Sequence, residues 1–228
     1  HLSSQDQISA KQGWLQSAFM GQAKALPKVW LDPLQVEGWG YRRKARLGVR
    51  YVNKKDKVLV GFRERKSSFI TVMERCEVLH PLLGDNLELL GECIEKLSVK
   101  FHVPQIEVAI AELDTILILR HLQSLTREDE VILQEYGEKL KVTWYTQSGG
   151  LETVKPLFET VSLNYSLPDH DIKMSFLPTD FTQVNFELNQ KMINLTLKLL
   201  DLNKDDEVID LFCGLGNFTL QFHVMLRQ

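Results

Sequence analysis

Residues 207–219 read Glu-Val-Ile-Asp-Leu-Phe-Cys-Gly-Leu-Gly-Asn-Phe-Thr, a short apolar run that contains Asp210 and passes into a turn with two glycines. Such a run predicts a buried parallel strand over residues 207–212. Gly214 and Gly216 allow the backbone to turn tightly against a ligand. Residues 217–225 predict a helix whose first N–H groups would face that ligand. This order of strand, glycine turn and helix is typical of the opening of a nucleotide-cofactor domain.

The residues around the turn discriminate among nucleotide cofactors. A dinucleotide fingerprint requires a third glycine three residues after the second, and that position holds Thr219. This substitution disfavours an oxidoreductase with a Rossmann domain. A phosphate-binding loop requires Gly-Lys-Ser or Gly-Lys-Thr, whereas Gly216 is followed by Asn217 and Phe218. An acid at the strand end before Gly-x-Gly instead fits the first motif of S-adenosylmethionine-dependent methyltransferases, because that ligand carries no phosphates.

Motifs farther from the turn extend this interpretation. The segment 210–218, the upstream segment Asp180-Phe181-Thr182-Gln183-Val184-Asn185 and the helix start Asn189-Gln190-Lys191-Met192 together resemble the uracil-C5 RNA methyltransferases. Two more motifs, Trp-Gly-Tyr-Arg-Arg-Lys-Ala-Arg-Leu at 39–47 and Glu-Arg-Cys at 74–76, are similar to the members that act on 23S ribosomal RNA. The resemblance runs from His1 to about Thr219 and fades after Leu220.

The resemblance implies S-adenosylmethionine as cofactor and assigns residues to it. Gln183, Phe212 and Asn217 match positions that bind the methyl donor, and Asp210, Gly214 and Gly216 form the strand end and turn beside them. Without the resemblance, Gln183 is typical of a surface position and Asn185 of a helix N-cap.

The three cysteines, Cys76, Cys93 and Cys213, are odd in number and widely spaced, which argues against a disulfide framework and for a reducing cytoplasm. A lone cysteine such as Cys76 is typically a small buried hydrophobe. The resemblance instead implies that Cys76 matches the fourth ligand of a [4Fe–4S] cluster. The other three ligands of the family precede the residue that matches His1, so no cluster is expected in this chain.

No residue of this chain is expected to be catalytic, because the resemblance places the nucleophilic cysteine and the glutamate base beyond Gln228. The chain starts without a methionine, which indicates a piece of a longer protein. We therefore expect a truncated 23S rRNA methyltransferase that does not transfer methyl groups by itself and binds S-adenosylmethionine weakly or not at all. The alternative is a non-catalytic RNA-binding module.

The net charge of −3 conceals a basic segment. Residues 42–66 carry eleven Lys or Arg against two acids, a charge of +9, which leaves −12 for the rest of the chain. Apolar residues alternate with basic ones over 44–51, so the cations would share one strand face. A solvated surface hairpin is one interpretation, and a contact surface for RNA phosphates is the other. The candidate RNA-binding residues are Arg42, Arg43, Lys44, Arg46, Arg50, Lys54 and Lys55.

The elements predict three parts: an N-terminal helix and linker over 1–34, a central α+β RNA-binding domain with an antiparallel sheet over 35–150, and the start of an α/β Rossmann-like methyltransferase domain over 151–228. Helices are expected at 3–26 with Ser4 as cap, at 82–97, from Thr126 to about 140 with a capping box to Asp129, and at 186–200. Strands are expected at 44–51, 58–62, 106–112, 115–121 and 142–146, and short strands with turns at Pro156 and Asp169 over 151–184.

The chain contains no run of eighteen apolar residues and no signal-peptide pattern, so neither a membrane nor an export route is expected. The histidines show no i, i+4 pairing and no Cys-x-x-Cys exists, which argues against a zinc site. The expected partner is 23S ribosomal RNA, without DNA, for a cytoplasmic monomer.

Overall fold

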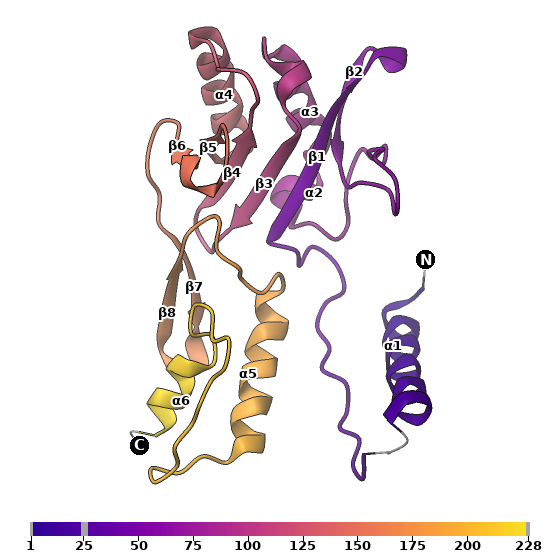
Figure 1. Cartoon of the computed structure of the whole chain (residues 1–228), viewed down its shortest axis with the longest axis vertical. Coiled ribbons are helices and arrows are strands. Elements are labelled where there is room, and N and C mark those ends of the chain that lie inside the picture. Colours follow the sequence, from indigo (N-terminus) through magenta and orange to yellow (C-terminus); the bar gives the residue numbers. More distant parts are fainter. Residues whose placement is uncertain (1, 24–26, 227–228) are drawn as a thin grey trace.

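The computed structural model describes residues 2–23 and 27–226. Its six-stranded sheet lies in the upper half of the view in Figure 1. The strand order in the sheet is β2-β1-β3-β4-β5-β6, and β7 and β8 form a separate hairpin. The strands are β1 Lys44–Val52, β2 Lys57–Gly61, β3 Gln105–Ile110, β4 Thr115–Arg120, β5 Thr143–Gln147, β6 Lys155–Pro156, β7 Leu163–Leu167 and β8 Ile172–Phe176.

The prediction of an antiparallel sheet was wrong at one pair. Strands β4 and β5 run parallel, with Ile116 opposite Thr143, while the other neighbours in the sheet are antiparallel. The cause is the connection, because helix α4 (Arg127–Leu140) crosses over between the two strands. A crossover of this kind returns the chain in the same direction. The sheet is therefore mixed.

Two apolar cores lie on the two faces of the sheet. Helices α2 (Pro81–Gly84), α3 (Leu87–Lys96) and α4 pack on one face, against residues such as Leu47 and Trp144. The hairpin β7–β8 and helices α5 (Phe186–Leu200) and α6 (Thr219–Met225) share the other core with sheet residues such as Ile118. The segment 151–228 is thus packed against the central sheet. The predicted division at residue 150 stays a prediction.

Several helices lie where local sequence signals predicted them. Thr126 and Asp129 make a full capping box at α4, and helix α5 spans the expected residues with Asn185 as its N-cap. The expected helix over 82–97 is divided into α2 and α3, and Pro156 pairs opposite Tyr145 within β6 instead of forming a turn. Short 3-10 turns occupy Asn53–Lys55, Lys100–His102, Leu151–Thr153 and Pro168–His170, the last at the predicted turn.

The N-terminal helix α1 (Ser4–Ala18) is followed by a π turn at Phe19–Ala23, and Ser3 rather than Ser4 is its N-cap. Residues 24–26 of the predicted helix lie outside the described residues. No residue of α1 is buried, and Figure 1 shows the helix standing apart from the sheet. No helix within the described part of the chain is long and apolar enough to cross a membrane.

The predicted strand over 207–212 is not formed. Ile209, Leu211 and Phe212 are exposed, and Phe212 has a left-handed φ of 62°. A strand is stabilised by hydrogen bonds to a neighbouring strand. Among the described residues, no strand pairs with this segment. Without a neighbouring strand to bond, this apolar segment therefore stays irregular. The prediction of a strand over 207–212 was wrong for this chain.

Candidate functional site

The glycine turn that leads into α6 is closed by its own backbone. Gly214 and Gly216 have φ values of 57° and 86°, a region that side chains disfavour. The amide of Gly216 donates to the carbonyl of Cys213 at 2.9 Å, and the amide of Leu220 donates to Gly216 at 3.1 Å. A Cβ on Gly214 would contact nothing within 4 Å. The turn thus presents open backbone at Gly214.

Asn217 fastens this turn to two other elements. Its Oδ1 accepts from the Nδ2 of Asn189 at 2.9 Å and from the hydroxyl of Tyr165 at 3.1 Å, while its Nδ2 donates to Asn189 Oδ1 at 2.8 Å. Burial raises the pKa of Tyr165, so the phenol stays a donor. Asp210 Oδ2 accepts from the hydroxyl of Thr219 at 2.6 Å. Both residues therefore order the turn through internal bonds.

Gln183 is half-buried in the loop before α5, between buried Thr182 and the cap Asn185. The side chain of Asn185 accepts from the amide of Leu188 at 2.9 Å. This cap fixes where the loop ends and the helix begins. Gln183 is thereby held in the loop just before α5.

The start of strand β1 is bonded directly to this loop. The backbone amide of Arg43 donates to the carbonyl of Val184 at 3.0 Å. Lys44 Nζ donates to the carbonyls of Pro178 and Asp180, both at 2.5 Å. Burial lowers the pKa of Lys44, although the negative charges of nearby carboxylates oppose the change. The ammonium group therefore clamps the loop instead of facing solvent.

Arg43 makes a second contact between the sheet and α5. Its Nη1 donates to the carbonyl of Ala111 at 3.0 Å, and its guanidinium lies 5.1 Å from the ring centroid of Phe186. Burial lowers the pKa of Arg43, opposed by the charge of Glu112. Arg43 and Lys44, two of the seven residues predicted to bind RNA, thus have half-buried cationic groups that bond backbone carbonyls of the protein.

Four of the other five basic candidates are exposed. Arg46 is 67% exposed and pairs with Glu107 at 2.9 Å, and Arg50 is exposed farther along the same strand face. Lys54 and Lys55 are exposed in the turn between β1 and β2, and Arg42 is half-buried. The structure therefore brings Arg46 and Arg50 onto one open face that leads from the turn toward the clamped loop.

The side chains predicted to bind the methyl donor do not form an enclosed site among the described residues. Phe212 is fully exposed, and the amide atoms of Asn217 are already paired within the protein. Gln221 in α6 is buried with both side-chain polar atoms unpaired among the described residues, and so is Oε1 of Gln190 in α5. These groups do not enclose a ligand such as S-adenosylmethionine, so no catalytic step follows from their geometry alone.

The three cysteines lie in different environments. Cys76 is half-buried, and its amide donates to the carbonyl of Gly84 at 2.9 Å. Burial raises the pKa of Cys93 to about 12, so this thiol stays protonated and unreactive. Cys213 is exposed in the glycine turn. Within the described ranges, no three His, Cys, Asp or Glu side chains are grouped to hold a metal ion.

We expect the purified chain to contain no stoichiometric iron, because Cys76 would supply a single thiolate where a [4Fe–4S] cluster needs four ligands. The measurement is an iron and sulfide assay after anaerobic purification and reconstitution. About four irons per chain with broad visible absorbance would contradict this expectation.

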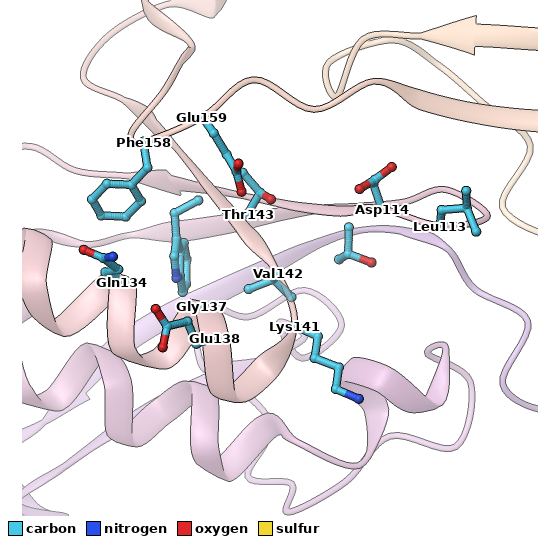
Figure 2. Close-up of a pocket in the computed structure, with 12 residues that line it drawn as sticks. Leu113, Asp114, Gln134, Gly137, Glu138, Lys141, Val142, Thr143, Phe158 and Glu159 are labelled. Atoms are coloured by element: carbon cyan, nitrogen blue, oxygen red, sulfur yellow. The ribbon is translucent and has the colours of Figure 1, made fainter.

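A pocket of about 570 Å³ lies where α4 ends and β5 begins. Figure 2 shows Gln134, Gly137 and Glu138 of α4 on one side of it, and Phe158 and Glu159 on the other. Asp114, Glu138 and Glu159 line it together with one cation, Lys141. No sequence signal indicated this pocket, since its walls come from three distant segments. Its acidic lining does not suit RNA.

Comparison with known proteins agrees with the sequence motifs. The family described as tRNA (Uracil-5-)-methyltransferase matches residues 4–228. The chain is 62% identical over 220 residues to the 23S rRNA (uracil(1939)-C(5))-methyltransferase RlmD of Vesicomyosocius okutanii, covering 96% of this chain and 50% of that protein. It is 49% identical over 222 residues to RlmD of Nitrosococcus oceani, covering 96% and 49%. The chain spans about half the length of the curated relatives it matches.

A solved structure shares the fold. The Pyrococcus abyssi tRNA (uracil-54, C5)-methyltransferase in complex with S-adenosyl-L-homocysteine superposes with a TM-score of 0.68 at 17% identity, over 97% of this chain and 54% of that one. The family match over nearly the whole chain, together with the motifs around Gln183 and Gly214, gives the assignment. The chain belongs to the family of S-adenosylmethionine-dependent RNA (uracil-5-)-methyltransferases.

Proposed function

We propose that this chain is the RNA-holding part of a 23S rRNA uracil-C5 methyltransferase of the RlmD type. The observation that carries the proposal is the contact between β1 and the loop before α5, through Arg43 to Val184 and Lys44 to Pro178 and Asp180. Because of it, the basic face of β1 ends where Gln183 is held. RNA lying on Arg46 and Arg50 would thereby be directed toward the donor edge.

Methylation at C5 of uracil requires a nucleophile that adds to C6 and a base that then removes the C5 proton. Buried Cys93 is too basic for the first role. We infer that both groups belong to the part of the full-length protein outside this chain. S-adenosylmethionine supplies the electrophilic methyl group when it is bound. Gln183, Phe212, Asn217, Asp210, Gly214 and Gly216 are the residues of this chain that we propose at its binding edge.

The role of Asn217 in this proposal is to position the turn. Its bonds to Asn189 and Tyr165 hold the open backbone of Gly214 at a fixed place relative to α5 and β7.

We further propose that Cys76 is one of four cluster ligands in the full-length enzyme. The substrate of that enzyme would be 23S ribosomal RNA, and the enzyme would act in the cytoplasm as a monomer. These proposals rest on the resemblance to the RlmD enzymes.

Removing Arg46 and Arg50 together is expected to weaken RNA binding and its salt dependence. Each phosphate contact releases counterions, so the slope of log affinity against log salt should flatten by about 0.7 per lost single-strand contact, or roughly one to two units in total. The measurement is fluorescence anisotropy of Arg46→Ala/Arg50→Ala with a 23S rRNA fragment over a range of salt concentrations.

The matched control is Arg127→Ala/Lys139→Ala, which removes the same charge from exposed positions on α4. This control should keep the slope of the unmodified chain, because α4 covers the opposite face of the sheet. If both double variants change the slope equally, net charge rather than the face of β1 governs binding, and the proposed RNA path is wrong.

A further inference from the structure

A second pocket, of about 330 Å³, lies beside the end of strand β1. It is lined from β1 by Arg50 and Tyr51, from the 3-10 turn after α3 by Lys100, Phe101 and His102, and from the loop after β4 by Leu122. Its volume is near the lower end of the range for small-molecule sites, about 300–1,000 Å³. None of the sequence motifs pointed to Phe101 or Lys100.

Two aromatic rings and the ammonium group of Lys100 lie together in this pocket. The rings of Tyr51 and Phe101 meet edge to face, with centroids 4.6 Å apart and an interplanar angle of 69°. Lys100 Nζ lies 5.4 Å from the Tyr51 centroid and 5.5 Å from that of Phe101. Phe101 is nevertheless 60% exposed. A large part of its ring surface is therefore open to a further planar group.

Backbone hydrogen bonds hold the pocket in shape. The amide of Val49 donates to the carbonyl of Pro104 at 3.1 Å, and the amide of Leu122 donates to the carbonyl of His102 at 2.8 Å. The amide of His102 also donates to Val99 at 2.7 Å. The turn that carries Phe101 is thus fixed to β1 on one side and to the loop after β4 on the other. A preorganised ring loses less entropy when a ligand binds.

The charge around the pocket favours an anion. Arg50 and Lys100 line it, and Lys54 and Lys55 occupy the neighbouring turn. The nearby acid Asp56 accepts a short hydrogen bond from the Tyr51 hydroxyl, and Glu95 is the other carboxylate close to that ring. Cations that surround exposed aromatic rings are the pattern by which proteins hold single-stranded nucleic acid.

We propose that Phe101 stacks one unpaired base of the RNA, and that Arg50 and Lys100 contact the phosphates on either side of it. The proposal rests on the function proposed above and extends it, since Arg50 belongs both to this pocket and to the basic face of β1. A duplex cannot offer such a base without unpairing it. The pocket therefore selects a single-stranded segment of the RNA.

The test compares two RNA probes on the full 228-residue chain. One is a fluorescein-labelled single strand of roughly 12 nucleotides, within the range of about 4–16 nucleotides for single-strand sites, and the other is a blunt duplex of the same length. Phe101→Ala should weaken single-strand binding about 5- to 10-fold, leaving the duplex affinity and the salt slope unchanged, because stacking is not ionic. Phe101→Trp should retain most of the single-strand affinity.

Two controls separate stacking from other effects. Phe158→Ala removes another exposed phenylalanine beyond β6, at the opposite edge of the sheet, and should leave both affinities unchanged. Lys100→Ala should flatten the salt slope by about 0.7, the value for one single-strand phosphate. Circular dichroism and thermal unfolding confirm that each variant is folded.

The outcomes distinguish this inference from the function it extends. If Phe101→Ala binds the single strand as tightly as the unmodified chain while Arg46→Ala/Arg50→Ala binds it weakly, the stacking site is wrong and the RNA path stands. If the unmodified chain binds neither probe, the proposed function itself fails. If Phe101→Ala loses affinity for polyglutamate and not for RNA, the pocket is a protein-binding surface and the inference is overturned.

Discussion

Replacing Asp129 by alanine is expected to lower the free energy of unfolding by about 3 kcal/mol, because it leaves buried donors without an acceptor. Asp129 is 1% exposed. Its carboxylate accepts from the amide of Ser98 at 2.7 Å, from the hydroxyl of Ser98 at 2.7 Å and from the amide of Thr126 at 2.9 Å. One side chain therefore caps α4 and ties its start to the end of α3. Urea unfolding followed by circular dichroism measures the loss.

The matched control is Glu128→Ala, the neighbouring acid in the first turn of α4, which is exposed. Its effect should stay within about 0.5 kcal/mol, as for other surface positions. If the two variants unfold at the same urea concentration, the bonds from Ser98 and Thr126 do not stabilise the fold, and the expectation is refuted.

The same carboxylate should make the free energy of unfolding of the chain depend on pH in the acidic range. Burial raises the pKa of Asp129, but hydrogen bonds from Thr126 and Ser98 outweigh it, so the pKa is lowered on folding. A lowered folded-state pKa means that the stabilisation is complete above the unfolded value of about 3.9 and is lost as the pH falls through the folded value. The stability gap between the unmodified chain and Asp129→Asn should therefore shrink as pH falls below about 4. A gap that stays constant down to about pH 2 would contradict this assignment.

This network shows which part of the structure local sequence could predict. The bonds between Thr126 and Asp129 join residues three positions apart, and the capping box was predicted from that spacing. The bonds from Ser98 to Asp129 span 31 residues and depend on how α3 packs beside α4. Propensity and periodicity carry no information about such a contact.

Strand β1 shows the same difference between local and distant contacts in the candidate site. Its alternation of apolar and basic residues correctly predicted the buried positions of Leu47 and Val49 and the exposure of Arg46 and Arg50. The alternation also placed Lys44 toward solvent or RNA, yet its ammonium group bonds carbonyls 134 and 136 residues away. A period of two assigns a side chain to a face of the sheet. It does not tell which other segment covers that face.

The segment 207–212 shows the converse, because a strong local signal did not produce its element. Its apolar residues are those of a central parallel strand, but such a strand is stabilised by neighbours on both sides. The same stretch nevertheless contains the motif that indicated the correct family. The glycine turn and the hydrogen bonds of Asn217 form even though the strand before them does not. Motif chemistry was therefore more reliable here than strand propensity.

Replacing Gly84 by alanine is expected to lower the free energy of unfolding by about 3 kcal/mol, at the upper end of the range for overpacked positions. A Cβ at this position would lie 2.5 Å from the carbonyl oxygen of Cys76 and 3.0 Å from that of Leu79. Both are backbone atoms, so no side chain can rotate away. The chain over 76–84 must shift, and the hydrogen bond from the amide of Cys76 to Gly84 would be strained. Thermal and urea unfolding measure the effect.

Gly13→Ala is the matched control, because Gly13 lies in α1 and an added Cβ there would meet nothing within 4 Å. This change should stabilise its helix by up to about 1 kcal/mol.

A thiol-labelling assay gives a second readout, since the shift of 76–84 should speed the modification of half-buried Cys76 in Gly84→Ala and leave exposed Cys213 unchanged. If Gly84→Ala unfolds and labels like the unmodified chain, Gly84 is not closely packed beneath Cys76. In the full-length enzyme the same shift would displace the Cys76 thiolate that we propose as a cluster ligand, so Gly84 would be required for both the fold and the cluster.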